Sequence, residues 1–222
     1  EVFGTDIPDA AVFRDRTIRG LAAVVDAHRG GVVGTTAIDA LPAPDPTAPL
    51  ALSAGEEAML FEYRSDPADT RYNVTRLYRL RGDVDVDRLE SALRDVVMAH
   101  EPLHTLFDPA RTRLGSADAV EFVARGTMSI EEMDAFADVR RRVPFDLDHG
   151  PLVRVDHARI ADDEVAVLIG MHHITIDAGT FDTFWSQVAA RAAGGPLPPL
   201  PLSYHDHTRI QAAELAGDRS HH

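Results

Sequence analysis

The chain has 222 residues and no cysteine, and its 36 acidic residues outnumber its 22 basic ones, giving a net charge of -14. The lack of cysteine excludes disulfides, thiolate metal sites and a cysteine nucleophile, and the acidic balance argues against nucleic acid or an anionic membrane surface as a partner. No apolar run approaches the roughly 20 residues that span a bilayer and no signal peptide is visible, so we expect a cytoplasmic protein.

The first 49 residues are expected to stand apart from the rest. Within residues 1–29, Thr17 is predicted to cap a helix, and Gly30 and Gly31 follow it. The apolar face of this helix would comprise Ile18, Leu21, Ala22 and Val25. Residues 30–49 contain four prolines spaced by small residues, which favours an extended linker.

From Leu50 onward the pattern predicts a larger domain, over residues 50–205. Two capping boxes, Ser53 with Glu56 and Ser129 with Glu132, mark helix starts, and single caps are predicted to begin two further helices at Asp85 and Thr180. Apolar and β-branched runs predict strands at residues 73–81, 103–107, 151–159 and 164–171.

The last two predicted strands are joined by a short turn, so they must pair antiparallel. The second of them is apolar on both faces, as a central strand should be. Together with the interspersed helices, these strands indicate an α/β or α+β domain with a mixed, partly antiparallel sheet.

His172 and His173 follow the predicted central strand, and Asp177 lies four residues after His173. A strand end fixes a side chain while the adjoining loop leaves it reachable, which suits a catalytic base. Because neighbours on an extended chain point to opposite sides, we expect one histidine to be structural and the other presented. The alternatives are a buried core histidine and, for Asp177, an Asx turn before Thr180. The group has too few ligands for zinc.

Three other histidines are expected to be structural or superficial. His100 falls on the apolar side of its predicted helix, which favours a buried, hydrogen-bonded ring. His205 and His207 lie in a polar stretch and are predicted to be surface residues.

The motif His172-His173-x-x-x-Asp177 resembles the H-H-x-x-x-D-G signature of condensation domains from nonribosomal peptide synthetases. Further resemblances to that family's first, second and fourth motifs and to its P-F-D-L…G-P-L stretch lie at residues 52–61, 100–107, 204–207 and 144–152. The resemblance covers residue 50 to about residue 211. It implies a chloramphenicol acetyltransferase-like fold of two lobes, of which this chain would be the first.

The resemblance also assigns the ends of the chain. Residues 1–29 look like the last third of a peptidyl carrier domain, without the serine that carries phosphopantetheine. Residues 206–218 would begin the crossover to the second lobe, and residues 219–222 look like the remnant of a tag.

Three positions near the motifs support or depart from the family pattern. Ser53 matches the serine of the first motif. Ala178 stands where the family has glycine after the aspartate, and His104 stands where the second motif has arginine.

The resemblance implies amide formation, in which the amine of an acceptor aminoacyl thioester attacks a donor acyl or peptidyl thioester. Upstream donor and downstream acceptor carrier domains would present both substrates on phosphopantetheine, and no metal or directly bound cofactor is expected. His173 would act as base or position the amine. His172 would be a packing and orientation residue, and Asp177 would brace the loop through a salt bridge. A single lobe is expected to be inactive and to self-associate through its uncovered face. The alternatives are an epimerisation domain, which shares the motif, and a noncatalytic domain that recruits a partner protein.

Overall fold

The chain forms two compact units, Glu1–Pro42 and Ala43–His222, in a computed structural model that describes residues 17–28, 48–116, 119–177 and 179–219. In the first unit α2 spans Ile18–His28, and Thr17 Oγ1 accepts a hydrogen bond from Gly20 N, so the predicted cap is confirmed. The carrier-like motifs before Thr17 and the linker up to residue 47 lie outside the described residues.

A four-stranded sheet forms the centre of the second unit, in the order β1-β6-β5-β4. Its strands are β1 (Asn73–Arg81), β4 (Val120–Thr127), β5 (Val153–Ala161) and β6 (Glu164–His172). The central strand β6 pairs antiparallel with both β1 and β5, whereas β4 pairs parallel with β5. The mixed, partly antiparallel sheet predicted from the sequence is therefore confirmed.

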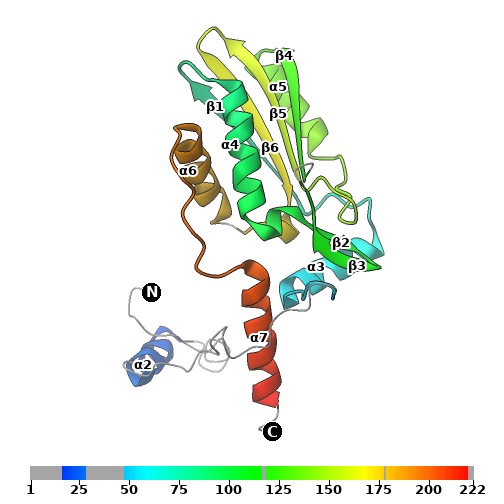
Figure 1. Cartoon of the computed structure of the whole chain (residues 1–222), viewed down its shortest axis with the longest axis vertical. Coiled ribbons are helices and arrows are strands. Elements are labelled where there is room, and N and C mark those ends of the chain that lie inside the picture. The colour runs from blue at the N-terminus through cyan, green and yellow to red at the C-terminus, as the bar shows by residue number, and fades with distance from the viewer. Residues whose placement is uncertain (1–16, 29–47, 117–118, 178, 220–222) are drawn as a thin grey trace. The chain divides into compact units, whose positions relative to one another are not determined.

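Helices cover both faces of this sheet (Figure 1). Helices α4 (Val86–Ala99) and α6 (Thr180–Ala192) lie on one face, and α5 (Ile130–Arg140) lies on the other. Alternate residues of β6 serve the two layers: Val167 and Ile169 pack with α4 and α6, while Ala166 and Leu168 pack with α5. The core on both faces explains why β6 reads as continuously apolar in sequence.

The predicted caps of three helices are present as hydrogen bonds. In α3 (Ala54–Ser65), Ser53 and Glu56 form both bonds of a capping box, and Ser129 and Glu132 do the same for α5. Asp85 accepts a bond from Arg88 N at the start of α4. Each bond satisfies an amide that the helix itself leaves unpaired.

Two sequence predictions need correction by a few residues. The strand predicted over residues 103–107 begins only at Thr105, because Pro102, which has no N–H to lose, stands in the first turn of the 3-10 helix η2 (Glu101–His104). The N-cap of α6 is Gly179, and Thr180 is the first helical residue.

Several elements were not predicted. These are β4 and β3 (Arg111–Leu114), which pairs with the predicted strand β2 (Thr105–Asp108) in a small second sheet. Residues expected to begin a crossover form most of α7 (Tyr204–Arg219), whose N-terminal end contacts η2. Among the described residues, no helix combines the length and the apolar character needed to cross a bilayer.

Candidate active site

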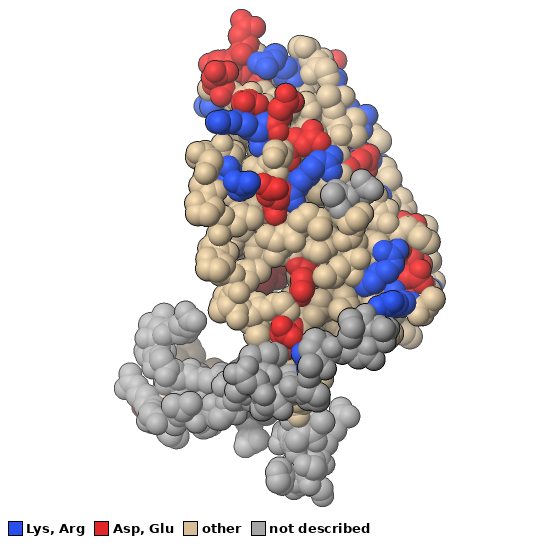
Figure 2. Space-filling model, in the orientation of Figure 1, with Lys and Arg blue, Asp and Glu red and all other residues tan. Residues whose placement is uncertain are grey.

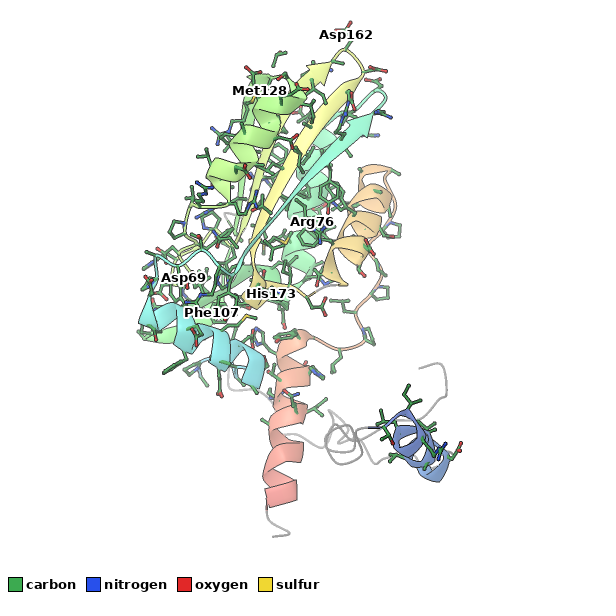
Figure 3. All side chains as sticks on the ribbon, turned by 180° about the vertical axis from the view of Figure 1, so that it is seen from behind. Asp69, Arg76, Phe107, Met128, Asp162 and His173 are labelled. Atoms are coloured by element: carbon green, nitrogen blue, oxygen red, sulfur yellow. The ribbon has the colours of Figure 1, made fainter. Side chains whose placement is uncertain are left out.

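The histidine pair lies at the end of β6, at the opposite end of the sheet from the β5–β6 turn at Asp162 (Figure 3). His172 is the last residue of the strand, and η4 (His173–Thr175), a single 3-10 turn, follows it. The His172 ring holds this turn, because its Nδ1 accepts a hydrogen bond from Ile174 N at 3.1 Å. Thr175 Oγ1 adds a second bond, to the carbonyl of His172 at 2.9 Å.

His172 is the structural member of the pair. Its side chain is buried, at 4% exposure, against the rings of Phe145 and Tyr72. Burial, with the nearby His173 as a smaller cause, lowers the pKa of His172 to about 4, so the ring is neutral at pH 7. Since Nδ1 accepts a bond, the single proton of the neutral ring must be on Nε2.

His173 is the presented member of the pair. Its side chain is exposed, while its backbone N–H donates to the carbonyl of Tyr72 at 2.8 Å. The backbone is thus anchored to the residue just before β1, and the ring remains reachable. As expected from the sequence, one histidine of the pair is buried and the other is exposed.

Asp177 is held by its own loop. The side chain is exposed, and its Oδ1 accepts bonds from Thr180 Oγ1 at 2.8 Å and Gly179 N at 3.0 Å. The Thr180 hydroxyl is the main cause of a lowered pKa for this carboxyl. These bonds form the Asx turn that the sequence analysis gave as an alternative for Asp177. The salt bridge implied by the resemblance is not among the ion pairs of the described residues, so Asp177 braces the loop through Thr180 and Gly179.

His104, which stands where the second family motif has arginine, is buried without a polar partner among the described residues. The side chain is 3% exposed, and neither ring nitrogen has a hydrogen-bond partner. Burial lowers its pKa, so the ring is neutral and cannot replace an arginine in an ion pair. Ala178, the other departure from the family pattern, lies outside the described residues.

Ser53 joins the first and fourth motifs. Besides capping α3, its Oγ lies 3.0 Å from the hydroxyl oxygen of Tyr204 at the start of α7. The carboxylate of Glu56 is buried in the same place and accepts the Ser53 N–H. These contacts attach α7 to α3 close to the turn that carries His173.

The surface position predicted for His205 is wrong. Its ring is buried, with Nε2 3.2 Å from Thr105 Oγ1, and its backbone N–H donates to Glu101. His207 is exposed, as predicted. His100 is half-buried, and its Nε2 lies 2.6 Å from the side-chain oxygen of Gln187.

A cavity of about 390 Å³ opens beside this loop. Figure 2 shows a hollow in the largely uncharged part of the face that carries α4 and α6. The lining comprises His100, Pro102, Leu103, Thr175, Asp177, Gly179, Thr180, Thr183 and Phe184. The lining combines apolar side chains such as Leu103 and Phe184 with polar ones such as Asp177 and Thr183, a mixture that suits an organic substrate. In the described part of the chain, no three His, Asp or Glu side chains gather in a way that could hold a metal.

Sequence reasoning did not place either aromatic neighbour beside His172: Tyr72 was not noted, and Phe145 was noted only as part of the P-F-D-L stretch. Tyr72 and Phe145 come from two other parts of the chain and touch His172 only because β1 and the segment before β5 reach the same sheet end. Both are ordinary core residues, so no local pattern indicated that they lie against His172.

Comparison with known proteins supplies the family. Residues 49–221 match the Condensation domain family. Phosphinothricin tripeptide synthetase PhsB of Streptomyces viridochromogenes is 30% identical over 98% of this chain, and tyrocidine synthase 3 of Brevibacillus parabrevis is 28% identical over 94% of it.

A solved structure agrees with this result. The complex of the X-domain and OxyB from teicoplanin biosynthesis contains a chain that is 25% identical, with a TM-score of 0.67 over 85% of this chain. The chain spans 20% of PhsB, 3% of tyrocidine synthase 3 and 43% of that solved chain. The chloramphenicol acetyltransferase-like fold implied by the resemblance is confirmed, and the chain belongs to the condensation domain family.

Proposed function

We propose that this chain is the N-terminal lobe of a condensation domain in a nonribosomal peptide synthetase, and that His173 serves amide formation there. The observation that carries the proposal is the division of the pair: a buried, neutral His172 fixes the turn, and the next side chain is exposed. The amine of a carrier-bound aminoacyl thioester would attack the carbonyl of a carrier-bound acyl or peptidyl thioester. The new C–N bond replaces the C–S bond, the donor carrier leaves as its thiol, and the amine gives up one proton.

Simple energetics limit what His173 must contribute. An α-amino group has a pKa of about 8, so about a tenth of it is already neutral at pH 7, which costs only about 1.4 kcal/mol. The thioester is already activated, and holding two tethered reactants together is worth up to about 7–11 kcal/mol. A hydrogen bond from the amine to the exposed imidazole therefore suffices, with proton removal as the amide forms.

The partners in this proposal are two carrier domains and a second lobe. Relatives that are peptide synthetases match 98% and 94% of the chain, which supports reading residues 1–29 as the tail of a carrier domain. The chain spans less than half of the solved X-domain chain, so a lone lobe would lack one wall of the reaction site and would show little activity. A serine-bearing carrier core encoded before Glu1 and a second lobe encoded after His222 would support this organisation. The cytoplasmic location remains a prediction that cell fractionation would test.

Substitution of His173 tests the proposal in the full-length synthetase. With donor and acceptor carriers loaded, His173→Ala is expected to lower the rate of amide formation by about 10²-fold, at the low end of the range for a general acid or base, because tethering supplies most of the acceleration. The matched control is His207→Ala, which also removes an exposed ring and should leave the rate unchanged. An unchanged rate in His173→Ala would remove this residue from the mechanism.

A second candidate is a noncatalytic condensation-like domain that recruits a partner protein. The solved complex of an X-domain with OxyB, at 25% identity to this chain, favours it. The two candidates differ in product: the loaded synthetase forms an amide in the first and none in the second. A stable complex with a purified partner encoded beside the synthetase, together with no amide product, would establish the second.

A further inference from the structure

The segment Val143–Phe145, between α5 and β5, is held by two side chains that come from different strands. Asn73, the first residue of β1, donates its Nδ2 to the carbonyls of Arg141 and Val143, both at 2.9 Å. Arg154 of β5 donates to the carbonyl of Val143 at 2.9 Å and to that of Pro144 at 2.7 Å. The Val143 carbonyl thus accepts two bonds. We call Asn73, Arg154 and residues 143–145 the clamp.

Arg154 is unusual because its donors go mainly to backbone. Its side chain is 13% exposed, and its Nε lies 3.7 Å from the carboxylate of Glu121, which is a long distance for an ion pair. Burial and the neighbouring Arg140 lower its pKa. The guanidinium instead stacks over the ring of Phe145 at 4.0 Å. A largely buried cation is costly, and its planar fork fits two adjacent carbonyls in a way that lysine cannot copy.

The clamp reaches the histidine turn directly. The Phe145 ring meets the His172 ring edge-on, with centroids 6.3 Å apart and an interplanar angle of 77°. Phe145 also belongs to the same buried cluster as Ile174, which follows His173. On the other side, Asn73 is the β1 residue that pairs with His172. The two neighbours of His173 in sequence are therefore both packed against parts that the clamp fixes.

We infer that Arg154 is a positioning residue: by holding Val143 and Pro144 and by stacking on Phe145, it fixes the turn from which His173 is presented. This inference rests on the proposed function of His173. Arg154 lies on the strand beside β6 and acts only through the clamp and His172. Misplacing a catalytic group by about 1 Å can cost on the order of 10²-fold in rate, so a loosened clamp should lower turnover without removing any reacting group.

Amide formation by the full-length synthetase gives the first test. Arg154→Met keeps an unbranched apolar stem but loses both carbonyl bonds, and it should lower kcat about tenfold while KM for the loaded acceptor carrier stays within about twofold. The kcat of Arg154→Lys should lie between those of Arg154→Met and wild type. The matched control is Arg159→Met, on the same strand, where the guanidinium donates to the exposed carbonyl of Asp162. This variant should behave as wild type.

Nuclear magnetic resonance of the 222-residue chain gives a second test that does not depend on activity. Wild type should show His172 as the Nε2–H tautomer with a sharp Nδ1 signal. In Arg154→Met the ring signals of His172 and His173 should shift or broaden, while those of His207 should not. If Arg154→Met does not fold, Arg154→Lys decides both tests.

The outcomes separate this inference from the proposed function. Absence of amide product in wild type overturns the proposed function, and with it the role of Arg154 in turnover. A wild-type kcat in the Arg154 variants overturns the inference alone. A lower kcat with unchanged His172 and His173 signals also overturns it, because the effect would not pass through the turn.

Discussion

A single buried ring, His172, separates the two roles in the motif. Neighbouring positions on a strand face opposite sides, and the sheet end buries one ring among Phe145 and Tyr72 while the next is exposed. The buried ring must be neutral to accept the Ile174 N–H and to avoid an uncompensated charge. The result is a fixed turn whose geometry depends on the protonation state of His172.

The pH dependence of stability follows from this ring. Its pKa is about 4 in the folded chain against 6.5 when exposed, so the unfolded chain binds the proton first as the pH falls. The contribution of His172 to the free energy of unfolding is therefore fully present above about pH 6.5 and is lost towards about pH 4, a difference of about 3 kcal/mol.

Urea denaturation between about pH 7 and about pH 4 measures this loss. In His172→Asn, which keeps an acceptor near the position of Nδ1, the change in the free energy of unfolding between these pH values should be smaller by about 3 kcal/mol. His207→Asn, which changes an exposed ring, should keep the wild-type dependence. Equal dependence in all three chains would show that His172 is not the buried titrating group. Carboxylates with lowered pKa values, such as Asp177, contribute equally to all three.

At the scale of elements, two capping boxes in the chain have different surroundings. Ser53 and Ser129 each cap a helix with the same pair of bonds, but only Ser53 also lies within hydrogen-bond distance of Tyr204 of α7. Loss of a cap costs about 1 kcal/mol, and loss of the added bond costs roughly 0.5–1.5 kcal/mol more.

The expected result is that Ser53→Ala lowers the free energy of unfolding by about 2 kcal/mol, whereas Ser129→Ala lowers it by about 1 kcal/mol. Chemical denaturation of the two variants and wild type provides the measurement. Tyr204→Phe should cost about as much as the difference between the two serine variants. A smaller loss in Ser53→Ala than in Ser129→Ala would contradict the link between α3 and α7.

These elements show which parts of the fold can be read from sequence. The caps at Ser53, Asp85 and Ser129 were predictable because each bond joins residues three apart. β6 was predictable because burial on both faces leaves a continuous apolar run. β4 was missed because the pairing register shifts within it, between Ala124 and Thr127, which breaks the alternation.

The candidate site likewise has features that follow from local sequence and features that depend on distant residues. The opposed histidines and the Asx turn at Asp177 follow from local geometry, and the sequence indicated both. The burial of His205 depends on Thr105, and the bond of Tyr204 depends on Ser53, so each rests on a partner far along the chain. Such contacts exist only once the elements have packed, and no local pattern encodes them.

At the scale of the whole molecule, self-association of the chain is the expected consequence of the proposed single-lobe organisation. Phe61 is 72% exposed on α3, the helix that contacts the η4 turn. Large exposed aromatic side chains favour association when they form part of an apolar face.

Light scattering over a range of concentrations should show an average mass that rises above that of the monomer. Phe61→Gln should reduce the rise, and Val139→Gln, which alters a 63% exposed residue on α5, should not. A constant monomer mass at high concentration would exclude the association, and equal effects of the two variants would exclude the α3 face as its site.

The order of the strands also governs how the chain can be completed on the ribosome. β1 is made first, but its partner is β6, the last strand to be made, with Asn73 opposite His172 and Arg81 opposite Glu164. Until β6 has been translated, β1 and β5 each have one edge without hydrogen-bonded backbone, because β6 is their partner there. Pairing between strands so far apart in the sequence is slow to form. Because β6 fills the middle of the sheet and ends in the histidine pair, the sheet is completed and the exposed imidazole of His173 is placed in one step.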